Sequence, residues 1–600
     1  MARQSRIVVL DFGAQYAHLI ARRIRQLRVF SEILDPNSSV KALKGAKGII
    51  LSGGPASVYE KDAPKFNKKI FSLKIPVLGL CYGHQLMAHA LGGKVEKGKV
   101  REYGFAELEI KKNAGLFNGL SQKETVWMSH GDKVEELPPG FEAIASTVDC
   151  ENAAVANEEK KLFGFQFHPE VTHTPHGLKI LENFVFGICN CKPDWTIGNY
   201  VEKKCCEIKK QVGERNVFLL ASGGVDSTVA LALLEKALGA ERVYSLHVDT
   251  GFMRKNESKN VAEALQKLGC SNFHVVNSQQ EFFEALRGKI EPEEKRKIIG
   301  EKFIEIQNRE LRKLNLNPKD WLLGQGTIYP DTIETAGTKN SARIKTHHNR
   351  VDSIMELLKA NLVVEPLNQL YKDEVRELGI ELGLPEEIVW RHPFPGPGLA
   401  IRCICSDGKT QDLSAVEEKA NAIAKEFGLH AIVLQIKSVG VQGDARSYAH
   451  PCALVGKADW KQLEKASTRI TNEICEINRV VWLVQPQQLE SVELEKAELS
   501  EERISLLQEA DAIVMQKIRE HGLMKEIWQF PTVLLPIKVN GIGESIVLRP
   551  VDSTEAMTAR FYPMKKEAME EITSKIMQVQ NIGAVFFDIT HKPPATIEWE

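Results

Sequence analysis

Short apolar runs alternate with longer amphipathic segments over about the first 190 residues of the chain. The runs at 7–10, 48–51 and 76–80 each lead into a turn that contains glycine. Runs of this length and composition are typical of buried parallel strands, which helices cover on both faces. The pattern predicts a doubly wound α/β domain, to which we assign residues 1–192.

A second alternation of the same kind follows a polar, proline-containing stretch at 189–194. Apolar runs at 217–221 and 243–248 precede helical patterns at 257–268 and 293–314. We therefore expect a second doubly wound α/β domain with a parallel sheet, which covers residues 193–404.

The last 200 residues contain a faint internal repeat, in which three landmarks recur in the same order. We expect helices at 421–423 and 511–513, strands before glycine-rich turns at 436–437 and 537–538, and helices that open at 470–471 and 572–573 and lead into strands at 479–484 and 584–589. Chance similarity between short apolar patterns is the alternative explanation. The repeat predicts two C-terminal α+β subdomains, 405–490 and 491–600.

The composition of the chain mainly excludes classes of partner and of cellular location. The 600 residues carry 78 Lys and Arg against 79 Asp and Glu, so no global positive field favours a nucleic-acid partner. Charged residues or glycine interrupt every apolar stretch before it reaches the ~18 residues of a membrane span. The start does not look like a signal peptide, and the 11 Cys include no CxxC pair. We expect a cytoplasmic protein with reduced thiols and no membrane partner.

The segment 75–86 combines a strand, a sharp turn and a helix around Cys81. Gly79 and Gly83 stand two residues away on each side, and they leave room for a strained turn that aims the sulfur outward. The helix N-terminus behind the thiol favours the thiolate, which is the attacking form. We expect a nucleophile at Cys81, with a buried core cysteine as the plain alternative.

His168 and Glu170 lie at the end of an apolar run that begins at Phe163. Residues two apart in an extended chain share a face, so Glu170 can fix the tautomer of His168 while His168 handles the proton of Cys81. Glycines at 51–55 follow another strand, and their N–H groups could join that of Tyr82 as an oxyanion hole. These features predict a Cys-His-Glu triad. A structural histidine and an ordinary tight turn are the alternatives.

The motifs G-x-C-x-G-x-Q, a distant H-P-E and S-G-G-P resemble the class I glutamine amidotransferase domain, over residues 6 to about 190. The resemblance implies that Cys81 attacks the amide of glutamine, forms a glutamyl thioester and releases ammonia, with His168 as acid and then base. It also implies oxyanion and glutamine-binding roles for Gly54, Tyr82, Gln85, His130, Gly131 and Asp132, of which the last three belong to a turn at 129–132.

A second motif follows the strand at 217–221 and opens a helix: Ser222, Gly223, Gly224, Val225, Asp226, Ser227 and Thr228. Glycines at a helix N-terminus present several N–H donors to an anion such as phosphate. The motif has no Walker-type Lys and carries Asp226 instead, which indicates a metal as counter-charge and disfavours γ-phosphoryl transfer. S-G-G-V-D-S resembles the signature of the N-type ATP pyrophosphatases, which attack ATP at the α-phosphate and release pyrophosphate. An unrelated glycine turn is the alternative.

Further segments at 344–349, 391–402, 440–448 and 592–600 extend the resemblance to the glutamine-hydrolysing GMP synthetase family, over essentially the full chain. This resemblance implies that ATP adenylylates xanthosine monophosphate (XMP) and that ammonia then displaces AMP to leave GMP. Asp226 would hold Mg²⁺ with ATP, and Lys345 would neutralise phosphate charge. The implied XMP-binding residues are Arg254, Asp444, Gln529, Lys592, Ile597 and Glu598.

Short members of this family dimerise through one C-terminal unit, whereas this chain carries two. We therefore expect the two units to pack on each other and the protein to be a monomer. Two other functions stay open: an ATP-pyrophosphatase amidotransferase with a different acceptor, and a non-catalytic glutamine or nucleotide sensor. The sensor is disfavoured because sensors tend to lose a nucleophile or metal ligand that this chain keeps.

Overall fold

A computed structural model describes residues 4–13, 16–60, 63–314, 317, 319–332, 360, 362–442, 445–553 and 559–600. The chain divides into two compact units, Met1–Lys204 with Tyr329–Ser341 and Cys205–Ile328 with Ala342–Glu600. Among the described residues, no helix is long and apolar enough to cross a membrane.

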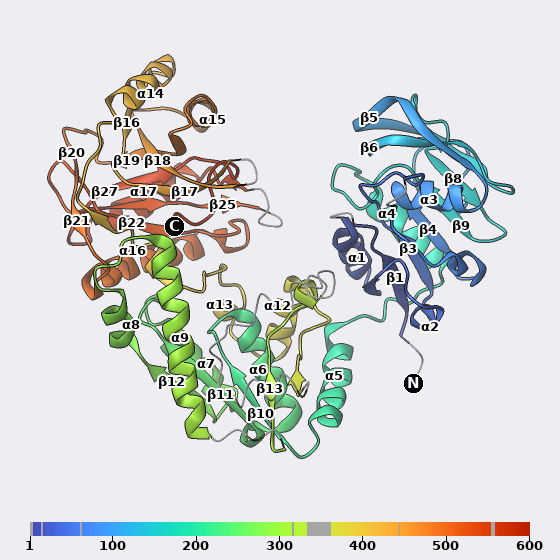
Figure 1. Cartoon of the computed structure of the whole chain (residues 1–600), viewed down its shortest axis with the longest axis horizontal. Helices are drawn as coiled ribbons and strands as arrows, with labels where there is room; N and C mark the ends of the chain where they lie inside the picture. Colours follow the sequence, from blue (N-terminus) through green and yellow to red (C-terminus); the bar gives the residue numbers. More distant parts are fainter. Residues whose placement is uncertain are drawn as a thin grey trace. The chain divides into compact units, whose positions relative to one another are not determined.

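The first unit is built on a nine-stranded sheet in the order β2-β1-β3-β4-β9-β8-β7-β5-β6 (Figure 1). The strands are β1 (Arg6–Leu10), β2 (Phe30–Leu34), β3 (Gly48–Leu51), β4 (Val77–Leu80), β5 (Lys94–Ile110), β6 (Lys123–Glu136), β7 (Glu142–Ser146), β8 (Ala154–Asn157) and β9 (Leu162–Phe165). The strands from β2 to β9 in this order are parallel. β3 and β4 are buried at every residue, as continuous apolar runs predict.

Four antiparallel strands, β8, β7, β5 and β6, continue this sheet beyond β9. The continuous apolar runs of the sequence did not predict these four strands. β6, for example, alternates buried and exposed residues, and its place in the sheet is set by pairing with β5. The helices of this unit are α1 (Tyr16–Gln26), α2 (Val40–Leu43), α3 (Tyr82–Ala90), α4 (Gly177–Glu182) and the short η1 (Lys68–Ser72) and η2 (Asn183–Ile188). α5 (Ile197–Val212) follows them in the chain.

The second unit begins with a five-stranded parallel sheet in the order β12-β11-β10-β13-β14. Its strands are β10 (Asn216–Leu220), β11 (Val243–Asp249), β12 (Phe273–Asn277), β13 (Trp321–Gly324) and β14 (Val363–Val364). Its helices are α6 (Val225–Leu238), η3 (Ala240–Arg242), α7 (Glu257–Lys267), α8 (Gln279–Leu286), α9 (Pro292–Leu314), α12 (Lys372–Glu381), α13 (Glu386–Val389) and η5 (Gly398–Ile401). The strand order reverses beside β10, and ligands of such sheets bind where the order reverses.

A seven-stranded sheet follows, in the order β16-β18-β19-β27-β24-β22 with β17 paired to β18 (Figure 1, gold to red). Residues 405–490 supply β15 (Ser406–Asp407), α14 (Ser414–Glu426), β16 (His430–Val433), β17 (Ser438–Gln442), β18 (Ala445–Val455), α15 (Trp460–Glu473) and β19 (Ile477–Gln485). Residues 491–600 supply β20 (Val492–Leu494), β21 (Lys496–Ala497), α16 (Glu501–Glu520), η6 (Leu523–Lys525), β22 (Thr532–Leu535), β23 (Ile537–Val539), β24 (Glu544–Leu548), β25 (Val551–Asp552), β26 (Arg560–Phe561), α17 (Lys566–Ile576) and β27 (Ile582–Asp588).

The two halves of this sheet have the same construction. In each, a helix leads to an antiparallel strand pair, and a second helix leads to a strand parallel to the last one: β16 with β18 and β19, and β22 with β24 and β27. β19 and β27 then pair antiparallel and join the halves into one sheet. The arrangement is the one expected of two packed copies of a single unit.

Two of the expected landmarks lie elsewhere. Ile470-Thr471 and Ile572-Thr573 stand near the ends of α15 and α17 rather than at their starts. α15 begins ten residues earlier because Asp459 accepts the N–H of Gln462 and forms a capping box with it. Residues 436–437 lie between β16 and β17 and not on a strand, whereas Ile537-Lys538 do lie on β23.

Candidate active sites

Cys81 lies at the junction of β4 and α3, where it is the N-cap of the helix. Its backbone has φ 50° and ψ −105°, which is strained for a residue with a side chain. The N–H of Cys81 donates to the carbonyl of Phe165 on β9 at 2.7 Å and ties the turn to the neighbouring strand. This is the strained strand-to-helix turn that the glycine spacing predicts.

Gly79 and Gly83 are required by close approach of the backbone. A Cβ at Gly79 would lie 2.5 Å from the carbonyl oxygen of Gly83, and a Cβ at Gly83 would lie 2.4 Å from that of Leu51. Both separations are far below van der Waals contact. The spacing of the two glycines around Cys81 is therefore a steric consequence of the turn.

The thiol of Cys81 is held among polar groups. Its residue is 8% exposed, and Sγ lies 3.6 Å from the carbonyl oxygen of Ser129 and 3.6 Å from the amide Nε2 of Gln166. Gln166 was not singled out from the sequence, where nothing distinguishes it from the apolar residues around it except its polarity.

His168 contacts both Cys81 and Glu170. Its Nδ1 lies 2.8 Å from Oε1 of Glu170, which is completely buried. Burial alone lowers the pKa of His168, but the Glu170 carboxylate and a hydrogen bond with the Cys81 sulfur outweigh burial and hold that pKa well above its usual value. The imidazole is thus suited to carry a proton beside the sulfur.

The geometry that joins His168 to Glu170 differs from the one expected. β9 ends at Phe165, and residues 166–170 form a loop rather than a continuing strand. The backbone carbonyl of Glu170 accepts a hydrogen bond from Nε of Arg23 at 2.8 Å, which holds this loop against α1. A turn, and not the alternation of an extended chain, brings the carboxylate to the imidazole.

The implied glutamine-binding residues gather around one carbonyl. Nε2 of Gln85 donates to the carbonyl of Asp132 at 2.7 Å, and Nδ1 of His130 lies 3.0 Å from the same oxygen. Nε2 of His130 contacts Glu102, and the carboxylate of Asp132 accepts hydrogen bonds from Ser57 and Tyr59. His130, Gly131 and Asp132 lie within β6 and not in a turn, because they pair with β5.

The expected oxyanion donors lie on two elements. Gly54 follows β3, and a Cβ there would lie 2.9 Å from the carbonyl oxygen of Phe12. Tyr82 is the first residue of α3 and packs its ring against Phe12 at 5.4 Å. Within the described ranges, the N–H groups of Gly54 and Tyr82 have no hydrogen-bond partner, so both stay available to a ligand.

The loop 221–224 joins β10 to α6 as the sequence predicts. Gly224 is the N-cap of α6, and Gly223 has φ +73°, which favours glycine. The hydroxyls of Ser227 and Thr228 donate to the carbonyl of Gly224 at 3.0 and 2.9 Å, so they brace the loop. The helix N-terminus is left facing outward from the sheet edge, where it can receive an anion.

Lys372 is a cation at this loop that the sequence analysis missed. It opens α12, and its Nζ lies 2.6 Å from each carboxylate oxygen of Asp226. Burial lowers the pKa of Lys372 against the opposing effect of Asp226, and Arg376 and Arg391 lower it further. Lys372 is thus bound to Asp226, with Arg376 and the Glu257-paired Arg391 as further cations near the same carboxylate, and cations of this kind suit a polyphosphate.

The residues at the loop fit a Mg²⁺ that is held chiefly by nucleotide phosphates. Mg²⁺ bound with ATP usually takes one or two protein carboxylates and several phosphate or water oxygens. Asp226 supplies such a carboxylate, on which Lys372 takes one acceptor position of each oxygen and leaves the others for a metal. Over the described ranges, no group of three or more His, Cys, Asp and Glu forms an all-protein metal cage.

The implied acceptor residues in the second unit fall into one region. Glu598 is bound by Arg402, and Nε2 of Gln529 donates to its Oε1 at 3.0 Å. The carbonyl of Ile597 accepts from Nε of Arg549 at 3.0 Å, and the N–H of Lys592 donates to Ala559. Lys345 and Asp444 lie outside the described residues.

Arg254 lies between β11 and α7 and contacts residues of the same region. Its Nε lies 3.2 Å from Oδ2 of Asp511, and its guanidinium lies 4.7 Å from the ring centre of Phe394. Arg402 lies 5.0 Å from that same ring centre. Neither Asp511 nor Phe394 was singled out as a site residue, although Phe394 belongs to the proline- and glycine-rich segment 391–402.

The segments 440–448 and 592–600 also meet. Gly440 and Ala595 form an antiparallel bridge, and the N–H groups of Val439 and Val441 donate to Trp599 and Pro594. The motif of the first half therefore lies against the motif of the second half. Both halves contribute to the region around Glu598.

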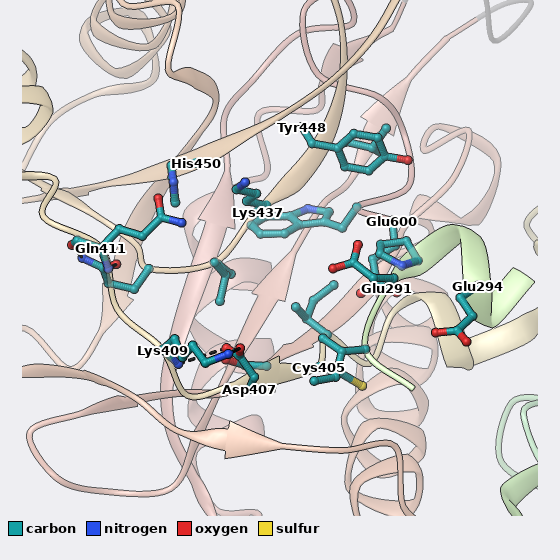
Figure 2. A pocket seen from close by; sticks show the side chains of 18 of the residues that line it. Glu291, Glu294, Cys405, Asp407, Lys409, Gln411, Lys437, Tyr448, His450 and Glu600 are labelled. Atoms are coloured by element: carbon teal, nitrogen blue, oxygen red, sulfur yellow. Dashed lines mark hydrogen bonds and ion pairs between the residues drawn. The ribbon is translucent and has the colours of Figure 1, made fainter. Parts of the chain in front are cut away.

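A cavity of about 650 Å³ lies beside this region, and of the implied acceptor residues that the structure describes none lines it (Figure 2). Trp599 and Glu600 line it together with side chains of both charges, including Glu291, Lys437 and the paired Asp407 and Lys409. Trp599 and Glu600 follow Glu598 directly in the chain, so one short segment contributes both to the acceptor region and to the lining of this cavity.

Three family models match the chain. The model for glutamine amidotransferase class-I covers residues 8–188, the model for NAD synthase covers 199–310, and the model for the GMP synthase C terminal domain covers 416–494 and 516–599. The first contains Cys81 and His168, and the second contains the loop 221–224.

Curated relatives match over the whole length. A probable glutamine-hydrolysing GMP synthase of Leptospira interrogans is 47% identical and covers 100% of both chains. Glutamine-hydrolysing GMP synthases of Aquifex aeolicus and Brachyspira hyodysenteriae are 45% and 38% identical, each over 99% of both chains. Because the likeness extends over both units and the sites described above, this chain belongs to the glutamine-hydrolysing GMP synthase family.

Proposed function

We propose that this chain makes GMP from XMP, ATP and glutamine. The observation that carries the proposal is that one polypeptide contains both Cys81 with His168 and Glu170, and the glycine loop before α6, within a full-length likeness to GMP synthases. The two sites supply complementary halves of one reaction: one releases nitrogen, and the other activates the atom that receives it.

Glutamine hydrolysis starts at Cys81. Its sulfur attacks the side-chain amide carbon, and the tetrahedral oxyanion receives hydrogen bonds from the N–H groups of Gly54 and Tyr82. His168 donates its proton to the departing ammonia, which leaves a glutamyl thioester. His168 then accepts a proton from water, which attacks the thioester and releases glutamate. Glu170 keeps Nδ1 of His168 bound, so that Nε2 serves the reacting atoms.

The second site activates XMP. The 2-oxygen of the purine attacks the α-phosphate of ATP, pyrophosphate departs, and ammonia then attacks C2 and displaces AMP. The loop residues 222–228 would bind the phosphates, with Lys372, Arg376 and Arg391 as further cations. Asp226 would hold a Mg²⁺ together with the phosphates, and this ion would supply positive charge to the departing pyrophosphate. Lys345 would add a cation to the same phosphates.

The acceptor nucleotide would contact Arg254, Asp444, Gln529, Lys592, Ile597 and Glu598. A cation such as Lys592 suits its 5'-phosphate, and the carboxylate of Glu598 suits N–H or hydroxyl donors. The contact between Gln529 and Glu598 joins two of these residues within the second half, and the bridge between Gly440 and Ala595 supports an acceptor site that draws on both halves of the C-terminal sheet.

We also propose that the protein is a cytoplasmic monomer. The pairing of β19 with β27 gives each C-terminal unit its partner within the chain, in place of the second chain that the resemblance implies for short family members. All eleven cysteines are free thiols in the structure, in keeping with a reducing compartment.

An amidotransferase with another acceptor is the second candidate function, and a sensor is the third. Incubation with ATP, Mg²⁺ and ammonia separates them: the proposal requires AMP to form only when XMP is present. AMP formation without XMP would favour another acceptor. Absence of AMP with any acceptor, despite nucleotide binding, would favour a sensor.

The decisive experiment measures GMP formation with glutamine or with ammonia as the nitrogen source. We expect Cys81→Ala to abolish the glutamine-dependent reaction and to leave the ammonia-dependent reaction unchanged. We expect Asp226→Ala to abolish both, because adenylylation precedes either nitrogen source. Loss of both activities in a folded Cys81→Ala protein would contradict the division into two sites.

A further inference from the structure

Glu598 stands in a segment whose backbone is held by two buried arginines. Arg549 donates to the carbonyls of Thr596 and Ile597 at 2.8 and 3.0 Å, and Arg479 donates to those of Thr596 and Glu598 at 3.1 Å each. Asp588 lies 2.7 Å from each guanidinium, and all three side chains have no exposed surface. The path of the main chain at 596–598 is thereby fixed.

The side chain of Glu598 is held separately, by Arg402. Nε and Nη2 of Arg402 bind Oε2 and Oε1 of Glu598 at 2.9 and 2.8 Å, a two-point contact that also fixes the plane of the carboxylate. Arg402 has no exposed surface, and its Nη1 has no hydrogen-bond partner in the part of the chain that the structure describes.

The remaining hydrogen-bonding capacity of Glu598 is small. A carboxylate offers about four acceptor positions, two on each oxygen. Arg402 takes one position on each oxygen, and Gln529 takes the second on Oε1. Counting the residues that the structure describes, one position on Oε2 is left for a ligand, so the direction of that bond depends on how Arg402 orients the carboxylate.

We infer that Arg402 is a positioning residue for the acceptor nucleotide, which acts by presenting one oxygen of Glu598 to a hydrogen-bond donor of XMP. The inference rests on the proposed function, since it takes XMP to be the ligand of Glu598. A buried ion pair is often no more stabilising than an apolar pair of similar size. Orientation, rather than stability, therefore explains why a charged pair stands here.

Arg402 also belongs to a segment that connects the proposed site of XMP with that of ATP. It ends the segment 391–402, in which Arg391 binds Glu257 at 2.7 Å and the ring centre of Phe394 lies 4.7 Å from the guanidinium of Arg254 and 5.0 Å from that of Arg402. A displacement of Arg402 would move the carboxylate that faces XMP without altering the loop 221–224. We therefore expect its loss to affect XMP much more than ATP.

The test measures KM for XMP and for ATP in the full-length protein, with ammonia as nitrogen source. We expect Arg402→Gln to raise KM for XMP about 10- to 100-fold, the loss that corresponds to one hydrogen bond to a charged group. KM for ATP should stay within about twofold. Arg402→Lys keeps the charge but not the two-point contact, so we expect an intermediate value.

A double-mutant comparison separates positioning from a general effect. If Arg402 acts through Glu598, then Arg402→Gln should add less than about threefold to the KM of Glu598→Gln. Independent, multiplying effects would overturn the inference, as would a KM for XMP that Arg402→Gln leaves unchanged. If Arg402→Gln does not fold, the same comparison with Arg402→Lys decides.

Arg503→Lys is the matched control. Arg503 is also buried and binds Glu544 and the carbonyl of Ile404, but it holds no residue of 595–600. The substitution Arg503→Lys should lower the melting temperature about as much as Arg402→Lys does, and it should leave KM for XMP unchanged. If the wild-type protein forms no GMP from XMP, the proposed function itself is contradicted. That result is obtained without any variant, so it is distinct from a failure of the inference about Arg402.

Discussion

His168 is the residue whose protonation decides the glutaminase reaction. Its raised pKa keeps the imidazole protonated to higher pH than usual, and it must be protonated to donate to departing ammonia. In Glu170→Gln the main attractive charge is lost while burial still lowers the pKa. We expect the alkaline limb of the glutaminase pH profile to move to lower pH and kcat to fall about 100-fold or more.

Glutamate release between pH 6 and 10 provides the measurement, with ammonia-dependent GMP formation as the control for folding. An unshifted alkaline limb in a folded Glu170→Gln protein would mean that Glu170 does not set the protonation of His168.

Lys372 is the residue whose charge faces the phosphate loop most directly. Its ammonium has three N–H donors and lies 2.6 Å from each oxygen of Asp226, so it can bind Asp226 and a phosphate together. We expect Lys372→Gln to raise KM for ATP about tenfold, the effect of one charge-assisted hydrogen bond, and to spare glutaminase activity. Lys566→Gln, at an exposed position on α17, should change neither value. A normal KM for ATP in Lys372→Gln would place this cation outside the ATP site.

At the scale of elements, the elbow between β4 and α3 depends on a contact that only glycine permits. A methyl group at Gly83 would collide with the carbonyl of Leu51, so Gly83→Ala must displace α3 or β3. We expect the free energy of unfolding to fall by about 1–3 kcal/mol, together with a large loss of glutaminase activity. Thermal or urea unfolding of the purified protein checks the first value.

Gly187→Ala is the control for this change, because a Cβ at Gly187 would meet nothing within 4 Å. It should leave both stability and activity near their wild-type values. Equal effects of the two substitutions would show that the close approach at Gly83 does not limit the elbow.

The elements differ in how far sequence predicts them. β1, β3, β4, β10 and β11 were predicted within one or two residues, because a strand buried on both faces needs a continuous apolar run. The elbow at Cys81 and the phosphate loop were predicted because glycine spacing restricts the backbone locally, whereas His168 and Glu170 were placed together by a strand alternation that the structure replaces with a turn. His130 was assigned to a turn because its strand pairing with β5 is a long-range property that no local pattern carries.

Contacts between distant residues were beyond prediction for the same reason. Lys372 lies 146 residues from Asp226, and Arg402 lies 196 residues from Glu598. Neither Lys372 nor Arg402 stands out by its residue type within its own segment of the sequence. Their roles appear only when the sheet order and the burial of each side chain are known.

At the scale of the whole molecule, the C-terminal sheet predicts the oligomeric state. β19 and β27 use each other's edges within the chain, so the pairing that would join two copies is already satisfied. We expect a single species near 67.1 kDa by light scattering at micromolar concentration. A stable species of twice that mass would contradict the monomer.

Each half of the C-terminal sheet also supplies one of the arginines that hold residues 596–598: Arg479 comes from β19, and Arg549 follows β24. In many duplicated proteins one copy can accumulate substitutions without consequence. Here a change at Arg479 or at Arg549 would remove hydrogen bonds from the same residues, 596–598. A protease cut in the connection at 486–491 would leave the halves associated along the β19–β27 seam. Excision of the first half would remove the Arg479 guanidinium from Asp588, whereas excision of the second half would remove Asp588, Arg549 and residues 596–598 themselves.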